Sequence, residues 1–226
     1  MKKRILICVA HPDDEVLGCG GVIQHHKRKG DQVYCLSLTN GVSARDYNSK
    51  IIQKKVLDRK KCSIISAKVL GFKWLDSTQK FEDNRLDKYE LLDVVKYIEK
   101  AKKKINPHII YTHNKSDLSI DHKVIYNAVI TAFRPQDKEI WQEILTFEIP
   151  SSTDFNPDGN FKPNYIIDIK KFIKKKIKAF SLYKEEVRKY PHSRSLKGIE
   201  TLAKIRGLQN GIEYAEAFQI VKKIKR

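Results

Sequence analysis

Histidine and acidic residues are crowded together where an expected strand ends. The stretch "HPDDE" at residues 11–15 follows directly on the apolar run "ILICVA", which is typical of a buried strand. Three consecutive acids repel one another when they leave water, unless a positive charge offsets them. His11 and Asp14 stand three residues apart across the turn into a helix, so an imidazole and a carboxylate can reach one cation. A bound divalent metal would account for the crowding.

A second polar motif follows another apolar run. "THNKSDLSIDH" at residues 112–122 comes directly after "HIIY". Ligand sites of parallel sheets form beyond the carboxyl ends of the strands, so we expect both motifs to face one crevice. His122 would then join His11 and Asp14 in a set of two nitrogens and one oxygen, which is typical of a catalytic zinc site with one position open to water. Asp13, beside Asp14, is placed to accept a proton as general base.

Each motif also has a plain structural interpretation. "HPDD" alone could be a turn with an aspartate capping the helix, and "DH" could be a similar cap. Their presence at two strand ends of one expected sheet favours the chemical interpretation. Two histidines and a carboxylate suit Fe²⁺ and other divalent ions as well as zinc, so the metal is left open.

Apolar runs and helical patterns alternate along the first part of the chain. Strand-like runs occur at residues 4–10, 32–39, 108–113, 143–149 and 164–169, and helical patterns at 16–29, 47–69, 87–104 and 121–133. This alternation predicts an α/β, Rossmann-like fold with a mostly parallel sheet flanked by helices. We expect the glycines of "GCGG" at 18–21 to allow close packing of the first helix, because they do not follow the order of a dinucleotide-binding loop.

The pattern changes at about residue 135. "FEIPSSTDFNPDGNFKPN" at 147–164 is rich in proline, asparagine and serine, and a helical tail is expected from residue 170 onward. At 226 residues we predict a single domain over 1–226. Residues 1–134 would form the α/β core with the metal site, and 135–226 an extension of strands and helices that completes the substrate crevice.

The chain is strongly basic, with 45 Lys and Arg against 27 Asp and Glu and a net charge of +18. The lysines are spread over many helix faces without a recognised nucleic-acid-binding module. A solvated lysine-rich surface is therefore favoured over attraction of a phosphate-bearing substrate, and both over nucleic acid. The four cysteines lack paired spacing, which indicates a cytoplasmic protein. No segment is apolar enough for a membrane span, and homo-oligomerisation stays open.

The chain resembles the PIG-L, or LmbE-like, deacetylase family. "AHPDDEVLGCGG" matches its first signature almost letter for letter, and "NGVSARD", "THNKSDLSIDH", "FEIPSSTDF" and "RSLKGIETLAKIRG" extend the likeness over most of the chain. The resemblance implies zinc-dependent removal of the N-acetyl group of an amino sugar, with His11, Asp14 and His122 as metal ligands and Asp13 as base. The branch it looks like acts in polysaccharide or glycoconjugate assembly, which suggests a nucleotide-linked or lipid-diphosphate-linked sugar.

The resemblance also suggests roles for several further residues. Arg45 corresponds to a family arginine in the substrate crevice, and Glu148 lies in the segment that relatives use near the substrate opening. Asp121 would orient a metal-bound histidine or a neighbouring polar group. Many members carry a histidine where this chain has Ser119, which leaves the proton donor open between His113 and Asp13. Ser119 would then contact substrate.

Overall fold

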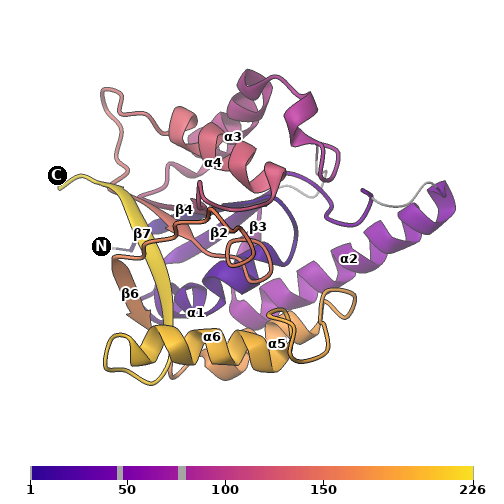
Figure 1. Ribbon diagram of the computed structural model, residues 1–226. Helices are drawn as coiled ribbons and strands as arrows, with labels where there is room; N and C mark the ends of the chain where they lie inside the picture. The colour runs from indigo at the N-terminus through magenta and orange to yellow at the C-terminus, as the bar shows by residue number, and fades with distance from the viewer. Residues whose placement is uncertain (1, 45–47, 76–79, 226) are drawn as a thin grey trace.

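The computed structural model describes residues 2–44, 48–75 and 80–225. Its centre is a seven-stranded sheet in the order β3-β2-β1-β4-β5-β7-β6 (Figure 1). The strands from β3 to β5 are paired in parallel, whereas β7 is antiparallel to both β5 and β6. The strands are β1 (Arg4–Val9), β2 (Gln32–Ser37), β3 (Lys73–Trp74), β4 (Ile109–His113), β5 (Glu143–Phe147), β6 (Tyr165–Asp168) and β7 (Ala215–Lys223).

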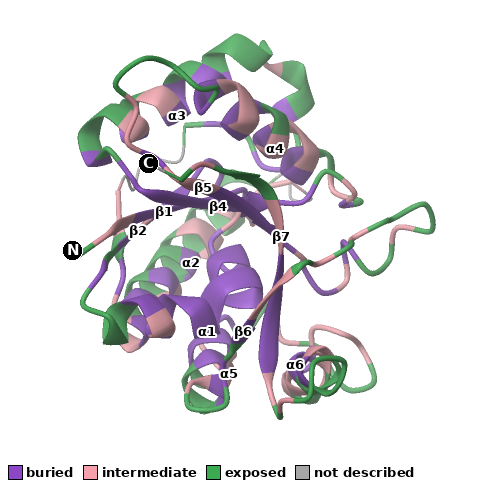
Figure 2. Cartoon of the chain, turned by 90° about the vertical axis from the view of Figure 1, so that its left-hand side faces the viewer, coloured by how far each residue is buried: buried purple, intermediate pink, exposed green. Residues whose placement is uncertain are grey.

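Helices cover both faces of the sheet. α3 and α4 lie on one face, and α1, α2, α5 and α6 on the other (Figures 1 and 2). They are α1 (Asp14–Arg28), α2 (Ser49–Leu70), α3 (Leu91–Ile105), α4 (Ile120–Ala132), α5 (Ile173–Ser181) and α6 (Leu196–Leu208), with a short 3₁₀ turn at Leu86–Lys88. This arrangement confirms the predicted α/β fold with a mostly parallel sheet.

The central strand explains why the core has two halves. Alternate side chains of β1 point to opposite faces: Ile5 and Ile7 join the cluster under α1, and Leu6 and Cys8 join the one under α3 and α4. All four are completely buried. A strand buried on both faces needs a continuous apolar run, which is why residues 5–10 lack polar alternation.

The C-terminal part differs from the expectation at one element. α5 and α6 are helices as predicted, but residues 215–223 form β7 rather than a continuation of the helical tail. The sequence "AEAFQIVKK" contains several good helix formers, so its intrinsic propensity does not clearly indicate a strand. Pairing with β5 on one side and β6 on the other outweighs that preference, because sheet neighbours decide strand formation more than propensity does.

The glycines of α1 allow close packing, as predicted. A Cβ at Gly18 would lie 2.3 Å from the Phe147 ring of β5, and one at Gly21 would lie 2.4 Å from Ile169. These distances are far below a van der Waals contact, so α1 can approach the sheet only without side chains there. The close approach fixes the start of α1, where the polar motif lies.

The described residues include no helix that is both long and apolar enough to cross a bilayer. Cys8, Cys19 and Cys35 are buried free thiols, and Cys62 is a partly exposed one. Burial raises the pKa of the Cys8 thiol to about 12 and holds the pKa values of Cys19 and Cys35 well above their usual range. These three thiols are therefore packing residues rather than nucleophiles.

The packing of α1 predicts that Gly18→Ala destabilises the protein. An added methyl group must displace the buried Phe147 ring, and overpacking of this kind lowers the free energy of unfolding by about 1–3 kcal/mol. The same change in an open helix would stabilise by about 1 kcal/mol, so urea unfolding distinguishes the two by sign. Combining Gly18→Ala with Phe147→Leu should cost less than the sum of the two single changes. A stabilised Gly18→Ala protein would contradict the packing.

Candidate active site

The two polar motifs meet because β1 and β4 are neighbouring parallel strands. Ile7 is in register with Tyr111, so the chain segments that leave these strands emerge side by side. After β1, Asp13 adopts a backbone φ of 148°, a conformation that costs energy for a residue with a side chain. Its N–H donates to Glu15 Oε2 at 2.9 Å, and the Tyr183 hydroxyl donates to the other oxygen of Glu15 at 2.8 Å. These buried contacts hold the turn.

Three side chains form a compact triangle at this point. His11 Nδ1 lies 3.3 Å from Asp14 Oδ2 and 3.4 Å from His122 Nε2, and the last two atoms are 3.4 Å apart. Ligand atoms about 2.0–2.2 Å from a tetrahedral zinc ion are about 3.3–3.5 Å from one another. The donor set and its spacing therefore fit a divalent metal of this size. The sequence motifs predicted these three residues as ligands.

The outer nitrogens of both histidines face carboxylates. His11 Nε2 is 3.2 Å from Asp83 Oδ1 and 3.3 Å from Asp121 Oδ2, and His122 Nδ1 is 3.0 Å from Asp117 Oδ1. Carboxylates at these positions fix the orientation of metal-binding histidines and raise their basicity. Asp121 thus lies where the sequence analysis expected a residue that orients a ligand.

The charges of the site favour a cation. Burial alone would lower the pKa of His122, but Asp14 and Asp117 raise it to about 9. Burial would likewise raise the pKa of Asp14, but the neighbouring His122 and His11 hold it well below its usual range. Positive charge among these groups is therefore stabilised, and a metal ion would supply it while the histidines stay neutral.

Asp13 lies beside the triangle, where it can reach a substrate or water in the cavity. It lines the cavity described below, and its buried Oδ2 accepts no hydrogen bond from the described residues. Burial and the nearby Asp14 carboxylate raise the pKa of Asp13 to about 7. A carboxylate that titrates near neutrality can accept and return a proton, which is what a general base requires.

His113 lies behind the site rather than in it. Its side chain is completely buried, and its ring stacks on His122 with centroids 3.8 Å apart. His113 Nε2 accepts the Ala10 N–H at 2.9 Å, and burial together with His122 lowers the pKa of His113 to about 3. A neutral ring in this position supports His122. Its placement therefore weighs against His113 as proton donor and favours Asp13.

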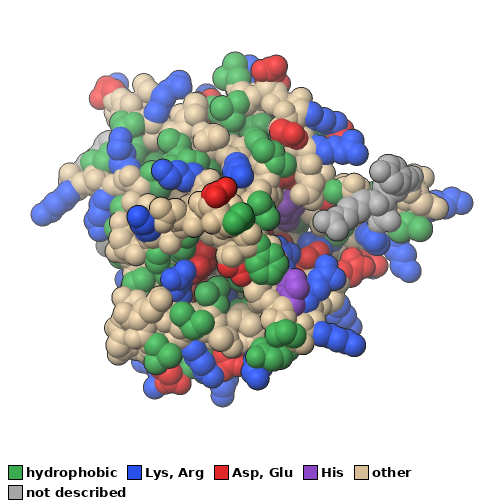
Figure 3. Space-filling model, viewed as in Figure 1, with side chains coloured by type: hydrophobic (Ala, Val, Ile, Leu, Met, Phe, Trp, Pro, Cys, Tyr) green, Lys and Arg blue, Asp and Glu red, His purple; other side chains and the backbone are tan. Residues whose placement is uncertain are grey.

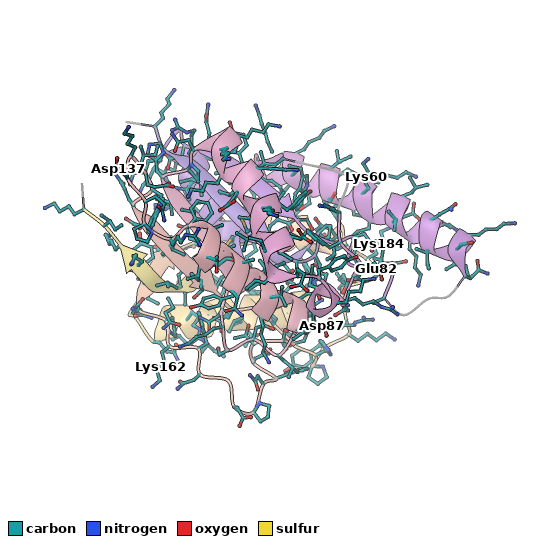
Figure 4. All side chains as sticks on the ribbon, turned by 90° about the horizontal axis from the view of Figure 1, so that it is seen from above. Lys60, Glu82, Asp87, Asp137, Lys162 and Lys184 are labelled. Atoms are coloured by element: carbon teal, nitrogen blue, oxygen red, sulfur yellow. The ribbon has the colours of Figure 1, made fainter. Side chains whose placement is uncertain are left out.

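A cavity of about 590 Å³ opens over the triangle. Its wall combines the turn at His11–Asp13 with parts of α2, the start of α4 and the C-terminal extension. Figure 3 shows histidine and acidic side chains in a hollow near the middle of one face. The lysine excess is not gathered there: Lys60 and Lys162, for example, lie on opposite sides of the molecule (Figure 4). A solvated basic surface, as favoured from sequence, describes this distribution.

The proposed substrate-contact residues fall in different places. Ser119 lines the cavity, and its buried Oγ makes no hydrogen bond to a described residue. Glu148 is not part of this cavity: its two carboxylate oxygens accept hydrogen bonds from Arg206 at 2.7 and 2.6 Å. This placement gives no support to a substrate role for Glu148. Arg45 lies outside the described residues, so its assignment stays a prediction.

Four residues that line the cavity were not singled out from the sequence: Arg59, Asp83, Glu186 and Arg194. Arg59 of α2 donates to the Pro12 carbonyl at 2.9 Å and pairs with Glu186. Glu186 also accepts from Arg194 at 3.0 Å, and Arg194 lies 3.5 Å from Asp13. No local motif could have indicated this chain of contacts, because it joins three separate segments: the turn at Asp13, α2 with Arg59, and the stretch with Glu186 and Arg194.

Comparison with known proteins decides the family. Residues 6–133, more than half of the chain, match the PIG-L family, described as GlcNAc-PI de-N-acetylase. The chain belongs to the PIG-L family. This PIG-L protein is also 30% identical to the Escherichia coli K12 protein named uncharacterized deacetylase YaiS, over 158 residues that cover 67% of the chain and 76% of the relative. The reaction class of this PIG-L protein is therefore hydrolytic N-deacetylation.

Solved structures share the fold of this PIG-L protein. The N,N'-diacetylchitobiose deacetylase of Pyrococcus horikoshii matches with a TM-score of 0.77 at 23% identity, covering 97% of this chain and 84% of the other. The 4-carboxy-2-hydroxymuconate hydratase GalB of Pseudomonas putida also gives a TM-score of 0.77, at 20% identity over 100% and 98% of the two chains. The same architecture thus carries different reactions.

The contact between Asp117 and His122 predicts a selective effect on metal affinity if the triangle binds a metal as the motifs indicate. With zinc as the probe, Asp117→Asn should then weaken binding about 10–100-fold, because loss of the carboxylate behind a metal-binding histidine reduces its basicity and loosens its orientation. Competition with a chelator measures the affinity. Asp31→Asn is the matched control, since Asp31 pairs with the remote His26 at 2.8 Å. Equal zinc affinities of the two variants would contradict the assigned role of Asp117.

Proposed function

We propose that the chain hydrolyses the N-acetyl group of an amino sugar, with a divalent metal held by His11, Asp14 and His122. The observation that carries this proposal is the ligand triangle with Asp13 beside it, at the floor of one cavity. The reaction class follows from the family, and the chitobiose deacetylase with the same fold acts on an N-acetylated sugar. Zinc is the ion proposed, because two nitrogens and one oxygen with an open position are its usual catalytic set.

Different residues of the chain have different roles in the proposed amide hydrolysis. A metal bound at the triangle would polarise the acyl oxygen and acidify water. Asp13 accepts the proton of the attacking water, whose oxygen bonds to the acyl carbon. Asp13 then returns the proton to the departing amine as the carbon–nitrogen bond breaks, which yields acetate and a free amino sugar. His113 and Asp117 keep His122 in place throughout.

The size and charge of the surroundings bear on the substrate. A volume of about 590 Å³ exceeds what a single acetamido group needs and falls in the usual range of about 300–1,000 Å³ for small-molecule sites. The resemblance in sequence extends the proposal to a nucleotide-linked or lipid-diphosphate-linked sugar, and Lys55 and Arg188 of the cavity wall are cations that could contact its anionic group. The branch that the sequence resembles supports a role in glycan or glycoconjugate assembly, and the free cysteines support a location in the cytoplasm.

Metal content and acetate release, measured on one preparation, test the function directly. We expect about one zinc per chain, and acetate from one class within a panel of free, nucleotide-linked and lipid-linked N-acetylated sugars. Removing the metal with a chelator should abolish release, and adding zinc should restore it. Bound metal with no acetate from any sugar would contradict sugar deacetylation and favour another acyl substrate or a metal-binding role without turnover.

Two substitutions separate metal binding from proton transfer. Asp13→Asn should retain the metal and lose about 10²–10⁴-fold in turnover, because its amide cannot accept the proton. His122→Ala should lose both metal and turnover, because it removes a ligand. Metal analysis alongside acetate release distinguishes the two. Near-normal turnover of Asp13→Asn would refute the role of Asp13 as base.

A further inference from the structure

Arg194 is held firmly at the edge of the candidate active site. Its Nε donates to the Pro150 carbonyl at 3.1 Å, and its Nη1 donates to Glu186 at 3.0 Å. Nη1 also lies 3.5 Å from Asp13 Oδ2. The side chain is 17% exposed and lines the cavity. Its position is therefore fixed by three partners, and it lines the space in which a substrate would lie.

One end of this guanidinium group is available. Nη2 of Arg194 makes no hydrogen bond or ion pair with any residue that the structure describes. The other buried arginine of the cavity, Arg59, is engaged by the Pro12 carbonyl and Glu186. Burial opposes the charge of Arg194, but Asp13 and Asp14 raise its pKa above the usual range, so the cation persists. Arg194 thus places a partly buried positive charge beside the proposed base.

During hydrolysis, negative charge moves between groups that lie near Arg194. When Asp13 accepts the proton of water, its carboxylate becomes neutral, and the electron pair of the acyl double bond moves onto the acyl oxygen. Negative charge leaves a group 3.5 Å from Arg194 and develops on the substrate. Arg194 keeps its hydrogen bond to Glu186 during this step and lines the cavity in which that oxygen would lie.

We propose that Arg194, through Nη2, donates a hydrogen bond to the acyl oxygen of the substrate and stabilises its negative charge in the tetrahedral intermediate. This inference rests on the proposed deacetylation. Fixed donors aimed at developing charge stabilise it without reorganising during the reaction, and this is why they contribute strongly. Glu186 supplies the fixation, because it accepts hydrogen bonds from both Arg59 and Arg194.

Arg194→Met tests the inference by binding as well as by rate. Removing one such donor typically lowers kcat about 10²–10³-fold. We expect that loss with zinc content unchanged and KM altered less than threefold. A phosphonamidate analogue of the N-acetylated sugar, which mimics the tetrahedral intermediate, should bind more weakly by a factor similar to the loss in kcat/KM. Arg194→Lys should retain part of both.

Arg206→Met is the matched control. Arg206 also belongs to the C-terminal extension and pairs with a carboxylate, Glu148, outside this cavity. It should leave kcat and analogue affinity unchanged, and circular dichroism should show that both variants are folded under the assay conditions. If Arg194→Met behaves like Arg206→Met in an enzyme that releases acetate, the inference fails while the function stands. If the wild-type protein neither releases acetate nor binds the analogue, both fail.

Discussion

The structure of the candidate active site depends on how buried negative charge is balanced. Five aspartates surround His11 and His122 within a single small volume, and all five are almost completely buried: Asp13, Asp14, Asp83, Asp117 and Asp121. Carboxylates withdrawn from water need positive charge or hydrogen bonds, and this cluster has fewer protein cations than carboxylates. The raised pKa of His122 and the raised pKa of Asp13 are two responses to the same imbalance. A dication at the triangle would correct this imbalance and allow the cluster to be maintained.

The fold serves this cluster by bringing distant segments to one strand edge. Parallel pairing of β1 with β4 brings the proposed ligands together, and the extension adds contacts from outside the core. Ser152 and Thr153 both donate hydrogen bonds to Asp117, the latter at 2.7 Å, so the extension supports the carboxylate behind His122. Arg194 does the same for the turn at Asp13. The site thus includes contacts from the C-terminal extension as well as from the α/β core.

How far the sequence predicts the site depends on the range of the interactions. His11, Asp14 and His122 are predictable because their positions follow from strand ends, and parallel strands end together. The support of His122 by His113 and the pairing of Glu148 with Arg206 depend on side-chain direction, which spacing does not reveal. β7 was missed for a related reason, since "AEAFQIVKK" becomes a strand only through the neighbours that receive it. Long-range contacts such as that of Arg194 with Asp13 leave no local pattern.

The position of β7 between β5 and β6 also sets an order of assembly. Within the described chain, β6 pairs with β7 and with no other strand, although it precedes β7 by about 50 residues. During synthesis β6 therefore has no sheet neighbour until the later strand has docked against β5. The intervening segment carries the cavity wall at residues 185–194, so the wall is anchored at both ends only after that step. During synthesis from the N-terminus, the strands of the parallel core are therefore all available before the last partner of the cavity wall has been made.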